Sequence, residues 1–427
     1  MARLSAARRV ALALTGERRR RGARARDLLR GASALDELDE RDRGLAVRLV
    51  MGATAAEGML DALIDSHLRR AAHLEPRVRD ALRLATFELV YLGTRPDVAV
   101  SQGVELVRSV APRATGLANA VLRRVAEGDV AAVAAARERV VSGTFDASDL
   151  ALVGGLPEWL AERVGTRALS ALDPAAPWVA TNVTKGQSLR NILEEAGCEP
   201  EEGPLPRSYR LGAPARLAPS GLVERVVVIP CDLAAQEVAL ACAPAPGERV
   251  LEVGQGRGTK TLLLQNAALA AGGPCEITAV EVSPRKSKLA ARRMDRAGVA
   301  GHVRCICADG RALPKDLGTF DLVFLDTPCS GTGTLSRHPE IAWSLDPSAP
   351  AELAALQGEL LASAAAHVAP GGRLVYATCS VLSEENDAVV QGFLSSPAGA
   401  GFTLERSGLT EVIGGSDTHF HAHLRRQ

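Results

Sequence analysis

Apolar residues in the first third of the chain recur with helical spacing. Leu74, Val78, Leu82, Ala85 and Leu89 fall on one face of a helix with about 3.6 residues per turn. Similar stretches run from about residue 3 to residue 140, with glycine and proline between them, and VAAVAAARERV at 130–140 is typical of a closing helix. The pattern predicts an all-α domain over residues 1–140.

The pattern changes after residue 140. Residues 141–230 are richer in proline and glycine and hold two short helical stretches, LPEWLAERVG and SLRNILEEAG, and one strand-like run, RVVVIP. We interpret them as a linker and a small α+β subdomain. From 231 to 427, apolar runs alternate with helical stretches, which is typical of a parallel sheet covered by helices on both faces. This C-terminal domain is expected to be α/β and Rossmann-like, with strands at 249–253, 276–282, 303–309, 320–326 and 373–378 and at the terminal FHAHLRR.

Length and composition agree with two or three globular domains. The chain has 427 residues, of which 47% are hydrophobic and 23% charged, and these values exclude a disordered or collagen-like protein. The 50 basic residues balance the 50 acidic ones, but residues 1–30 hold ten arginines against Glu17 and Asp27. Arginine-rich clusters suit contacts with phosphate groups.

The spacing of the cysteines and the lack of long apolar runs indicate in which cellular compartment the protein acts. The eight cysteines are spread widely, unlike a compact disulfide framework, which favours a reducing environment. No apolar run reaches the roughly 18 to 20 residues that a membrane helix needs, and no signal-type apolar core follows the arginine-rich start. We therefore expect a cytoplasmic protein with no membrane partner.

A glycine-rich turn joins the first expected strand of the C-terminal domain to a helical run. The turn follows Glu252 and reads GQGRGTKT at 254–261. Glycines at a helix N-terminus let a ligand approach the backbone. The spacing matches neither the usual dinucleotide fingerprint nor a Walker loop, so the turn alone is weak evidence for a ligand.

Acidic residues at the ends of the next two strands strengthen that evidence. Glu281 and Asp309 should lie at the carboxyl edge of the sheet, where Glu281 is suited to accept hydrogen bonds from ribose hydroxyls. The series favours an adenosyl ligand. The predicted cofactor-binding residues are Gly254, Gln255, Gly256, Arg257, Gly258, Thr259, Lys260, Glu281, Asp309 and Asp326.

Two cysteines are also expected at this edge. Cys329 follows the strand that ends at Asp326, and Cys379 follows the next strand, whereas Cys305 and Cys307 lie within a strand and are expected to be small buried apolar residues. A thiolate beside a methyl donor suits methylation at carbon 5 of a pyrimidine, because its addition to carbon 6 makes carbon 5 nucleophilic. Asp326 is placed to stabilise the charge shift on the base, and Lys260 is a candidate supporting residue.

Three segments of the chain resemble the RNA cytosine-5 methyltransferases of the RsmB/Sun (Fmu) type. They are LDTPCSGTGTLSRHPEIAW, YATCSVLSEEND, and EVSPRKSKLAARRMDRAG with CADGRALP. The resemblance implies a class I methyltransferase domain that uses S-adenosyl-L-methionine. It also implies that Cys379 is the nucleophile that attacks carbon 6 and that Cys329 assists release of the methylated product.

The resemblance extends to the helical region, which is similar to a NusB-like RNA-binding fold. The matching stretches are LDERDRGLAVRLVMGA, LDALIDSHL, LEPRVRDALRLATFELVYLGTRPDVAVSQGVELV and GLANAVLRR. A NusB-like domain joined to this catalytic domain implies the bacterial subgroup that methylates 16S rRNA, with no obligate protein partner.

The chain departs from the family pattern at three places. The family's cofactor loop CAAPGGKT reads GQGRGTKT here and keeps Gly258, Lys260 and Thr261. The RVN segment appears as residues 181–183, and the QDxASQ segment appears as CDLAAQ, with Cys231 in place of its first glutamine.

Alternatives to this function remain open from the sequence. They are a non-catalytic NusB-like RNA-binding or assembly factor, 5-methylcytosine formation in a different RNA, and a dinucleotide-dependent dehydrogenase, which leaves the two strand-end cysteines without a role. His419, His421 and His423 share one face of a strand, but no ligand cluster accompanies them, so no metal is expected.

Overall fold

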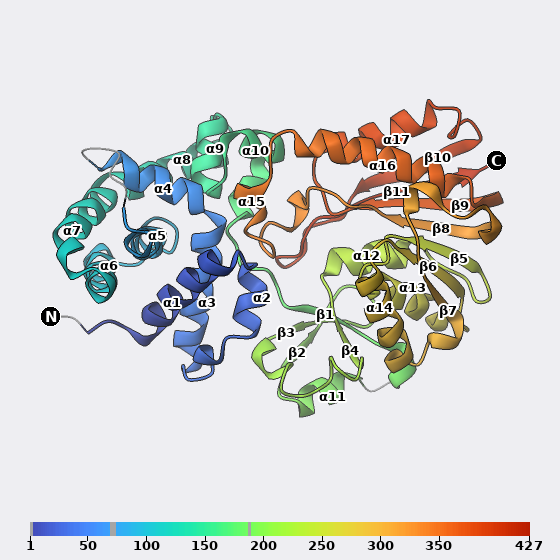
Figure 1. Cartoon of the computed structure of the whole chain (residues 1–427), viewed down its shortest axis with the longest axis horizontal. Coiled ribbons are helices and arrows are strands. Elements are labelled where there is room, and N and C mark those ends of the chain that lie inside the picture. The colour runs from blue at the N-terminus through green and yellow to red at the C-terminus, as the bar shows by residue number, and fades with distance from the viewer. Residues whose placement is uncertain (1–2, 69–73, 187–188) are drawn as a thin grey trace. The chain divides into compact units, whose positions relative to one another are not determined.

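The computed structural model describes residues 3–68, 74–186 and 189–427, and their contacts form two compact units, shown in Figure 1. The first unit ends at Pro174 and also contains Thr334–Pro347. The second comprises Ala175–Gly333 and Ser348–Gln427. Ser188, the first residue of a predicted helical stretch, lies outside the described residues.

The first unit is helical, as its periodicity predicts. Val78, Leu82 and Ala85 are buried in a long helix, α5, whose other faces are also largely enclosed, so α5 lies at the centre of the unit. The helices are α1 (Ala6–Arg21), α2 (Ala25–Arg30), α3 (Glu40–Ala55), α4 (Glu57–Ser66), α5 (Pro76–Val90), α6 (Pro96–Val110), α7 (Thr115–Arg124), α8 (Val130–Ser142), α9 (Ala147–Gly154), α10 (Glu158–Val164) and α15 (Ile341–Ser344).

The arginines near the N-terminus are largely engaged within this unit. Arg8 is buried, and its Nε donates to Glu88 at 2.8 Å. Arg19 Nε donates to Asp80 Oδ2 at 3.0 Å, and Arg18 pairs with Glu57. Much of the positive charge expected to face phosphates is therefore neutralised by carboxylates of the same unit.

The observed division differs from the predicted boundaries at 140 and 230. The helical unit continues through α9 and α10, where apolar residues such as Leu150 and Leu160 are buried. The small subdomain and the C-terminal domain form a single unit, since Asn182 donates to the carbonyls of Val226 and Ala297. Local composition carries no record of such long-range contacts.

A four-stranded antiparallel sheet begins the second unit. Its order is β2-β3-β1-β4, and α11 (Leu189–Glu195) accompanies it. The sequence pattern predicted one strand here, at β4. The other three are only three or four residues long, and β2 and β3 are also partly exposed, so their apolar signal is weak. The strands are β1 (Trp178–Thr181), β2 (Pro200–Glu202), β3 (Ser208–Leu211) and β4 (Val228–Pro230).

The larger sheet of this unit has seven strands in the order β10-β11-β9-β8-β5-β6-β7. The five strands from β5 to β9 are parallel, and β11 pairs antiparallel with both β9 and β10. All six predicted strands are present, and β10 is an additional edge strand. The strands are β5 (Arg249–Val253), β6 (Glu276–Glu281), β7 (Val303–Cys307), β8 (Phe320–Asp326), β9 (Val368–Thr378), β10 (Phe402–Leu409) and β11 (Phe420–Arg426).

Helices cover both faces of this sheet (Figure 1). One core contains Val238, Leu264 and Met294 from α12 (Leu233–Ala241), α13 (Thr259–Ala270) and α14 (Pro284–Ala297). The other contains Leu361 and Val390 from α16 (Ala349–Ala365) and α17 (Asp387–Leu394). The C-terminal half therefore has the predicted α/β Rossmann-like architecture.

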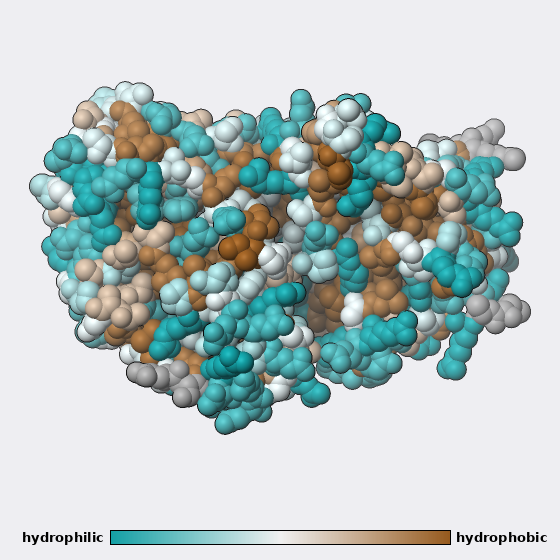
Figure 2. All heavy atoms as spheres, turned by 180° about the vertical axis from the view of Figure 1, so that it is seen from behind, coloured by the Kyte–Doolittle hydropathy of each residue, from teal (hydrophilic) through white to brown (hydrophobic). Residues whose placement is uncertain are grey.

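The described helices include none that is both long and apolar enough to cross a membrane. On the face shown in Figure 2, apolar side chains lie in small groups among hydrophilic ones.

Candidate active site

The glycine-rich turn follows β5 and leads into α13. Gly254 has φ of +91°, and a Cβ added to it would lie 2.0 Å from the carbonyl oxygen of Asp326. Gly258 is the N-cap of α13 with φ of +76°. The turn therefore requires glycine where the ends of β5 and β8 come closest and where the helix begins.

Two buried polar side chains beside this turn have unused acceptors. The carboxyl of Glu252 is fully buried and accepts from Thr261 Oγ1 at 2.6 Å through one oxygen, while Oε1 has no partner. Gln255 is buried, and its amide oxygen also has no partner. Burial raises the pKa of Glu252 to about 7. Two free acceptors at the carboxyl edge suit a ligand that donates hydrogen bonds.

Two other predicted acids lie at the carboxyl ends of neighbouring strands: Glu281 is the last residue of β6, and Asp309 follows β7. Glu281 accepts from the backbone N–H groups of Gly256 at 2.8 Å and Ser283 at 2.9 Å, so it orders the glycine turn. Asp309 is exposed and pairs with Arg311 at 2.7 Å, and the hydrogen bonds from that side chain lower the pKa of Asp309 to about 2. Both carboxylates lie at the edge predicted for them.

Lys260 and Asp326 form an ion pair. Lys260 Nζ lies 2.7 Å from each oxygen of Asp326. Burial opposes the charge on Lys260, but the attraction of Asp326 outweighs it and raises the pKa of the ammonium group. The structure thus brings together two predicted residues that are far apart in the sequence.

The two strand-end cysteines also meet. Asp326 in β8 pairs with Ala377 in β9, so the parallel strands end together. The Sγ atoms of Cys329 and Cys379 lie 2.7 Å apart, and the backbone N–H of Cys379 donates to Cys329 Sγ at 3.2 Å. The contact with Cys379, together with burial, raises the pKa of Cys329. Two thiols beside an ion pair can act on two adjacent atoms of one substrate, one thiol as a nucleophile and the other as a proton acceptor.

Cys305 and Cys307 do not match the expectation of two buried residues. Cys305 is half-buried and accepts from Gln255 Nε2 at 3.2 Å, whereas Cys307 is exposed. Both lie in β7, which is the last strand of the sheet and has no neighbour on one side.

A buried polar cluster that the sequence pattern does not predict lies behind the cysteines. Its members come from four separate segments. Their contacts link the loop that follows β8 and contains Cys329 (the Cys329 loop) to the loop that follows β9 and contains Cys379 (the Cys379 loop). A serine directly after each cysteine was the visible signal, but the sequence does not show that both face one carboxylate. The cluster consists of Ser330, Thr332, Gln357, Ser380, Glu385 and Asn386.

The histidines near the C-terminus contact each other. His421 Nδ1 lies 2.8 Å from His423 Nε2 in β11, and burial lowers the pKa of both rings. Within the described residues, no group of three or more His, Cys, Asp or Glu side chains is arranged to hold a metal ion.

The positions where the chain departs from the family pattern near residues 182 and 231 are buried. Asn182 is fully enclosed, and Gln236 Nε2 donates to the carbonyl of Cys231 at 3.3 Å. Asn182 also links the small sheet to α14, which covers the larger sheet.

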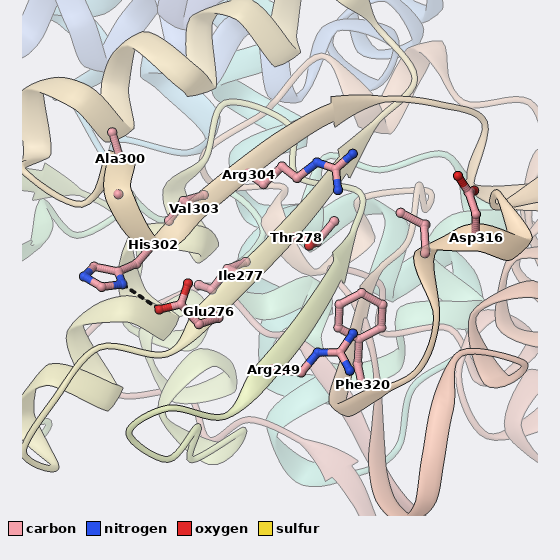
Figure 3. A pocket seen from close by; sticks show the side chains of 12 residues that line it. Arg249, Glu276, Ile277, Thr278, Ala300, His302, Val303, Arg304, Asp316 and Phe320 are labelled. Carbon is pink, nitrogen blue, oxygen red and sulfur yellow. Dashed lines mark hydrogen bonds and ion pairs between the residues drawn. The ribbon is translucent and has the colours of Figure 1, made fainter.

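A pocket of about 340 Å³ lies elsewhere on this unit (Figure 3). Arg249, Glu276, Val303 and Phe320, which line it, are the first residues of β5 to β8. The pocket is therefore at the amino edge of the parallel strands, opposite the cysteines, and it is not part of the candidate active site.

Family models match both parts of the chain. The model described as 16S rRNA methyltransferase RsmB/F matches residues 239–414, and the NusB family model matches residues 3–127.

Two curated relatives match over nearly their whole length. The ribosomal RNA small subunit methyltransferase B of Thermus thermophilus is 34% identical, with 95% of this chain and 94% of the relative aligned. The protein of the same name from Salmonella typhi is 30% identical over 90% and 91%.

Solved structures share the fold. The structure of PH0851 has a TM-score of 0.74 at 22% identity and covers 100% of this chain and 99% of its own. That of NSun6 from Pyrococcus horikoshii with SFG has a TM-score of 0.53 at 16% identity, covering 66% of this chain and 97% of its own. With matches to the NusB and RsmB/F models and curated relatives that align over nearly their whole length, the chain belongs to the RsmB/F family of 16S rRNA methyltransferases.

Proposed function

We propose that this rRNA methyltransferase converts a cytosine of 16S rRNA to 5-methylcytosine through a covalent bond between Cys379 and carbon 6. The observation that carries the proposal is the pair of thiols, 2.7 Å apart, beside the ion pair of Lys260 and Asp326. The proposed site of action is the cytoplasm, where the thiols stay reduced.

The residues at the carboxyl edge fit S-adenosyl-L-methionine. The glycine turn from Gly254 to Thr259, with Lys260, provides the cradle, and Glu281, Asp309 and Asp326 are the proposed acidic contacts. The unused acceptors on Glu252 and Gln255 suit a ligand that carries N–H and O–H donors. When bound, this cofactor supplies an electrophilic methyl group.

The reaction assigns a separate step to each thiol. The Cys379 thiolate forms a bond to carbon 6, and the electron pair displaced toward the ring makes carbon 5 nucleophilic. Asp326, with its partner Lys260, holds the edge of the base and stabilises the charge shift. After carbon 5 has gained the methyl group, Cys329 assists removal of the carbon 5 proton, and the Cys379–carbon 6 bond breaks. A stacked base hides carbon 6, so the target cytosine must be unpaired or extruded.

Methyl transfer to unmodified 16S rRNA tests this function. Labelled S-adenosylmethionine and nucleoside analysis should yield 5-methylcytosine. If product forms only on another RNA, the substrate assignment is wrong. If the protein binds RNA but neither cofactor nor product is detected, it is a non-catalytic RNA-binding factor.

Substitution of each cysteine should block the reaction at a different step. Cys379→Ala should abolish methyl transfer without forming an adduct, because no bond to carbon 6 can form. Cys329→Ala should accumulate a covalent protein–RNA adduct, visible on a denaturing gel, because release is blocked. Equal loss of activity without adduct in both variants would contradict the separate roles.

A further inference from the structure

Both cysteine loops are attached to one buried carboxylate, Glu385. Each cysteine is followed by a serine, Ser330 or Ser380, and both hydroxyls donate to Oε2 of Glu385, at 2.5 Å and 2.6 Å. The Oγ atoms of the two serines also lie 3.2 Å apart. Glu385 is fully buried, six residues beyond Cys379 in the sequence.

The other oxygen of Glu385 fixes the Cys329 loop on both sides of the thiol. Oε1 accepts from the backbone N–H of Ser330 at 2.8 Å and from Gln357 Nε2 at 3.1 Å. Gln357 Nε2 also donates to the carbonyl of Pro328 at 2.9 Å. The residues immediately before and after Cys329 are thus held by the carboxylate and by its neighbour.

The Cys379 loop is held in the same manner. Asn386, next to Glu385, donates from Nδ2 to the carbonyl of Ser380 at 3.0 Å. Its Oδ1 accepts from Thr378 Oγ1 at 2.6 Å. The residues that flank Cys379 therefore connect to the same cluster, while the thiol itself stays free to contact Cys329.

The charge of the Glu385 carboxylate does not explain why this residue lies here. Burying an anion costs free energy, and the hydroxyl and amide groups that donate to Glu385 from Ser330, Ser380 and Gln357 are all neutral. Its negative charge also opposes the thiolate form, since it contributes to raising the pKa of Cys329. What the carboxylate does provide is a set of acceptor sites that reach both loops at once.

We propose that Glu385 is a positioning residue for methyl transfer, which sets the separation and orientation of the Cys329 and Cys379 thiols by holding Ser330 and Ser380. The inference rests on the proposed cysteine mechanism. In that mechanism the thiols act on adjacent ring atoms, so their relative placement determines whether addition and release occur on one base.

The hydrogen-bond pattern offers a matched pair of substitutions. In Glu385→Gln, the amide oxygen can accept from the Ser330 N–H and Gln357, and the amide nitrogen can donate to the two serine hydroxyls. This variant keeps the cluster and removes the charge. Glu385→Ala removes the cluster, leaving several buried donors without an acceptor.

The kinetic test compares full-length wild type with both variants on unmodified 16S rRNA. Glu385→Ala should lower kcat by about 100-fold with KM for RNA little changed, since a displacement of about 1 Å is enough for such a loss. Glu385→Gln should recover most of kcat. If Glu385→Ala keeps the wild-type kcat, or if both variants are equally impaired, the proposal is wrong.

A second readout is independent of turnover. Iodoacetamide alkylation of each cysteine, followed against pH by peptide mass spectrometry, reports the thiols directly, and the exposed Cys307 is the internal reference. Glu385→Gln should shift the Cys329 profile to lower pH, and Glu385→Ala should shift it further, because the contact with Cys379 that raises the pKa of Cys329 is then loosened as well. Profiles that are unchanged in both variants would overturn the proposal. If the wild type forms no 5-methylcytosine but the profiles shift as stated, the proposed function fails, and only the placement of the thiols by Glu385 is supported.

Discussion

At the scale of single residues, Glu252 should make stability depend on pH. Burial raises its pKa from 4.5 to about 7, so the neutral form is favoured in the folded state. The stability that this provides is complete below pH 4.5 and is lost as the pH rises through about 7. In the absence of cofactor, Glu252→Gln, which resembles the neutral form, should therefore be more stable than wild type at high pH, by up to about 3 kcal/mol.

Thermal unfolding at about pH 5 and about pH 8 measures this difference. The melting temperatures of the two proteins should lie close together at the lower pH and separate at the higher one. A gap of the same size at both values would show that the charge on Glu252 is not the cause.

Some residues of the candidate site can be predicted from the sequence, and others cannot. Asp326 ends an apolar strand, and Cys329 and Cys379 follow such strands. The carboxyl edge of a parallel sheet brings residues in these positions together, so their proximity follows from the pattern. Glu385 could not be found in this way. It looks like one of several surface acids in SEEND, and its contact with Ser330 spans 55 residues.

At the scale of elements, α14 carries a set of exposed basic side chains. Its buried face consists of Ser287, Ala290, Met294 and Ala297, and its opposite face exposes basic residues. Among the described residues, no carboxylate forms an ion pair with these basic side chains. The exposed basic residues are Arg285, Lys286, Lys288, Arg292 and Arg296.

A salt titration of RNA binding tests the role of this helix. The triple variant Lys286→Ala, Lys288→Ala, Arg292→Ala should flatten the dependence of binding on salt, by about 0.7 to 0.9 in logarithmic slope for each phosphate that α14 no longer binds. The matched control is Arg190→Ala, Arg210→Ala, Arg425→Ala, which removes equal charge from arginines already paired with carboxylates. Equal slopes for the two triple variants would exclude a specific contribution of α14.

The strands illustrate why element prediction succeeds in the core and fails at edges. β5 and β8 are buried over most of their length, and β8 contains the continuous apolar run LVFL. β10, with the sequence FTLERSGL, is an edge strand whose residues are mostly exposed or half-buried. Its pairing with β11 provides the structure that its own composition does not indicate.

At the scale of the whole molecule, the chain leaves the methyltransferase unit directly after the Cys329 loop. Gly333 still donates its N–H to the carbonyl of Cys379 at 2.9 Å, and Thr334–Pro347 already belongs to the helical unit. Trp343 anchors that segment: its Nε1 donates to the carbonyls of Ala55 at 2.8 Å and Gly155 at 3.1 Å. The helical unit is therefore more than an N-terminal addition, because it also holds a segment from the middle of the catalytic half.

Replacing Trp343 tests whether this segment matters to catalysis. The indole ring packs on Gly58, where an added Cβ would lie 2.2 Å from the ring, so Trp343→Ala should leave a cavity and cost about 3 kcal/mol. Trp343→Phe keeps part of the ring but cannot donate either hydrogen bond, and its melting temperature should lie in between. Because Thr334 is joined directly to the cysteine loop, we expect kcat on 16S rRNA to fall in the same order. Lower melting temperatures with an unchanged kcat would show that the segment stabilises the helical unit without ordering the Cys329 loop.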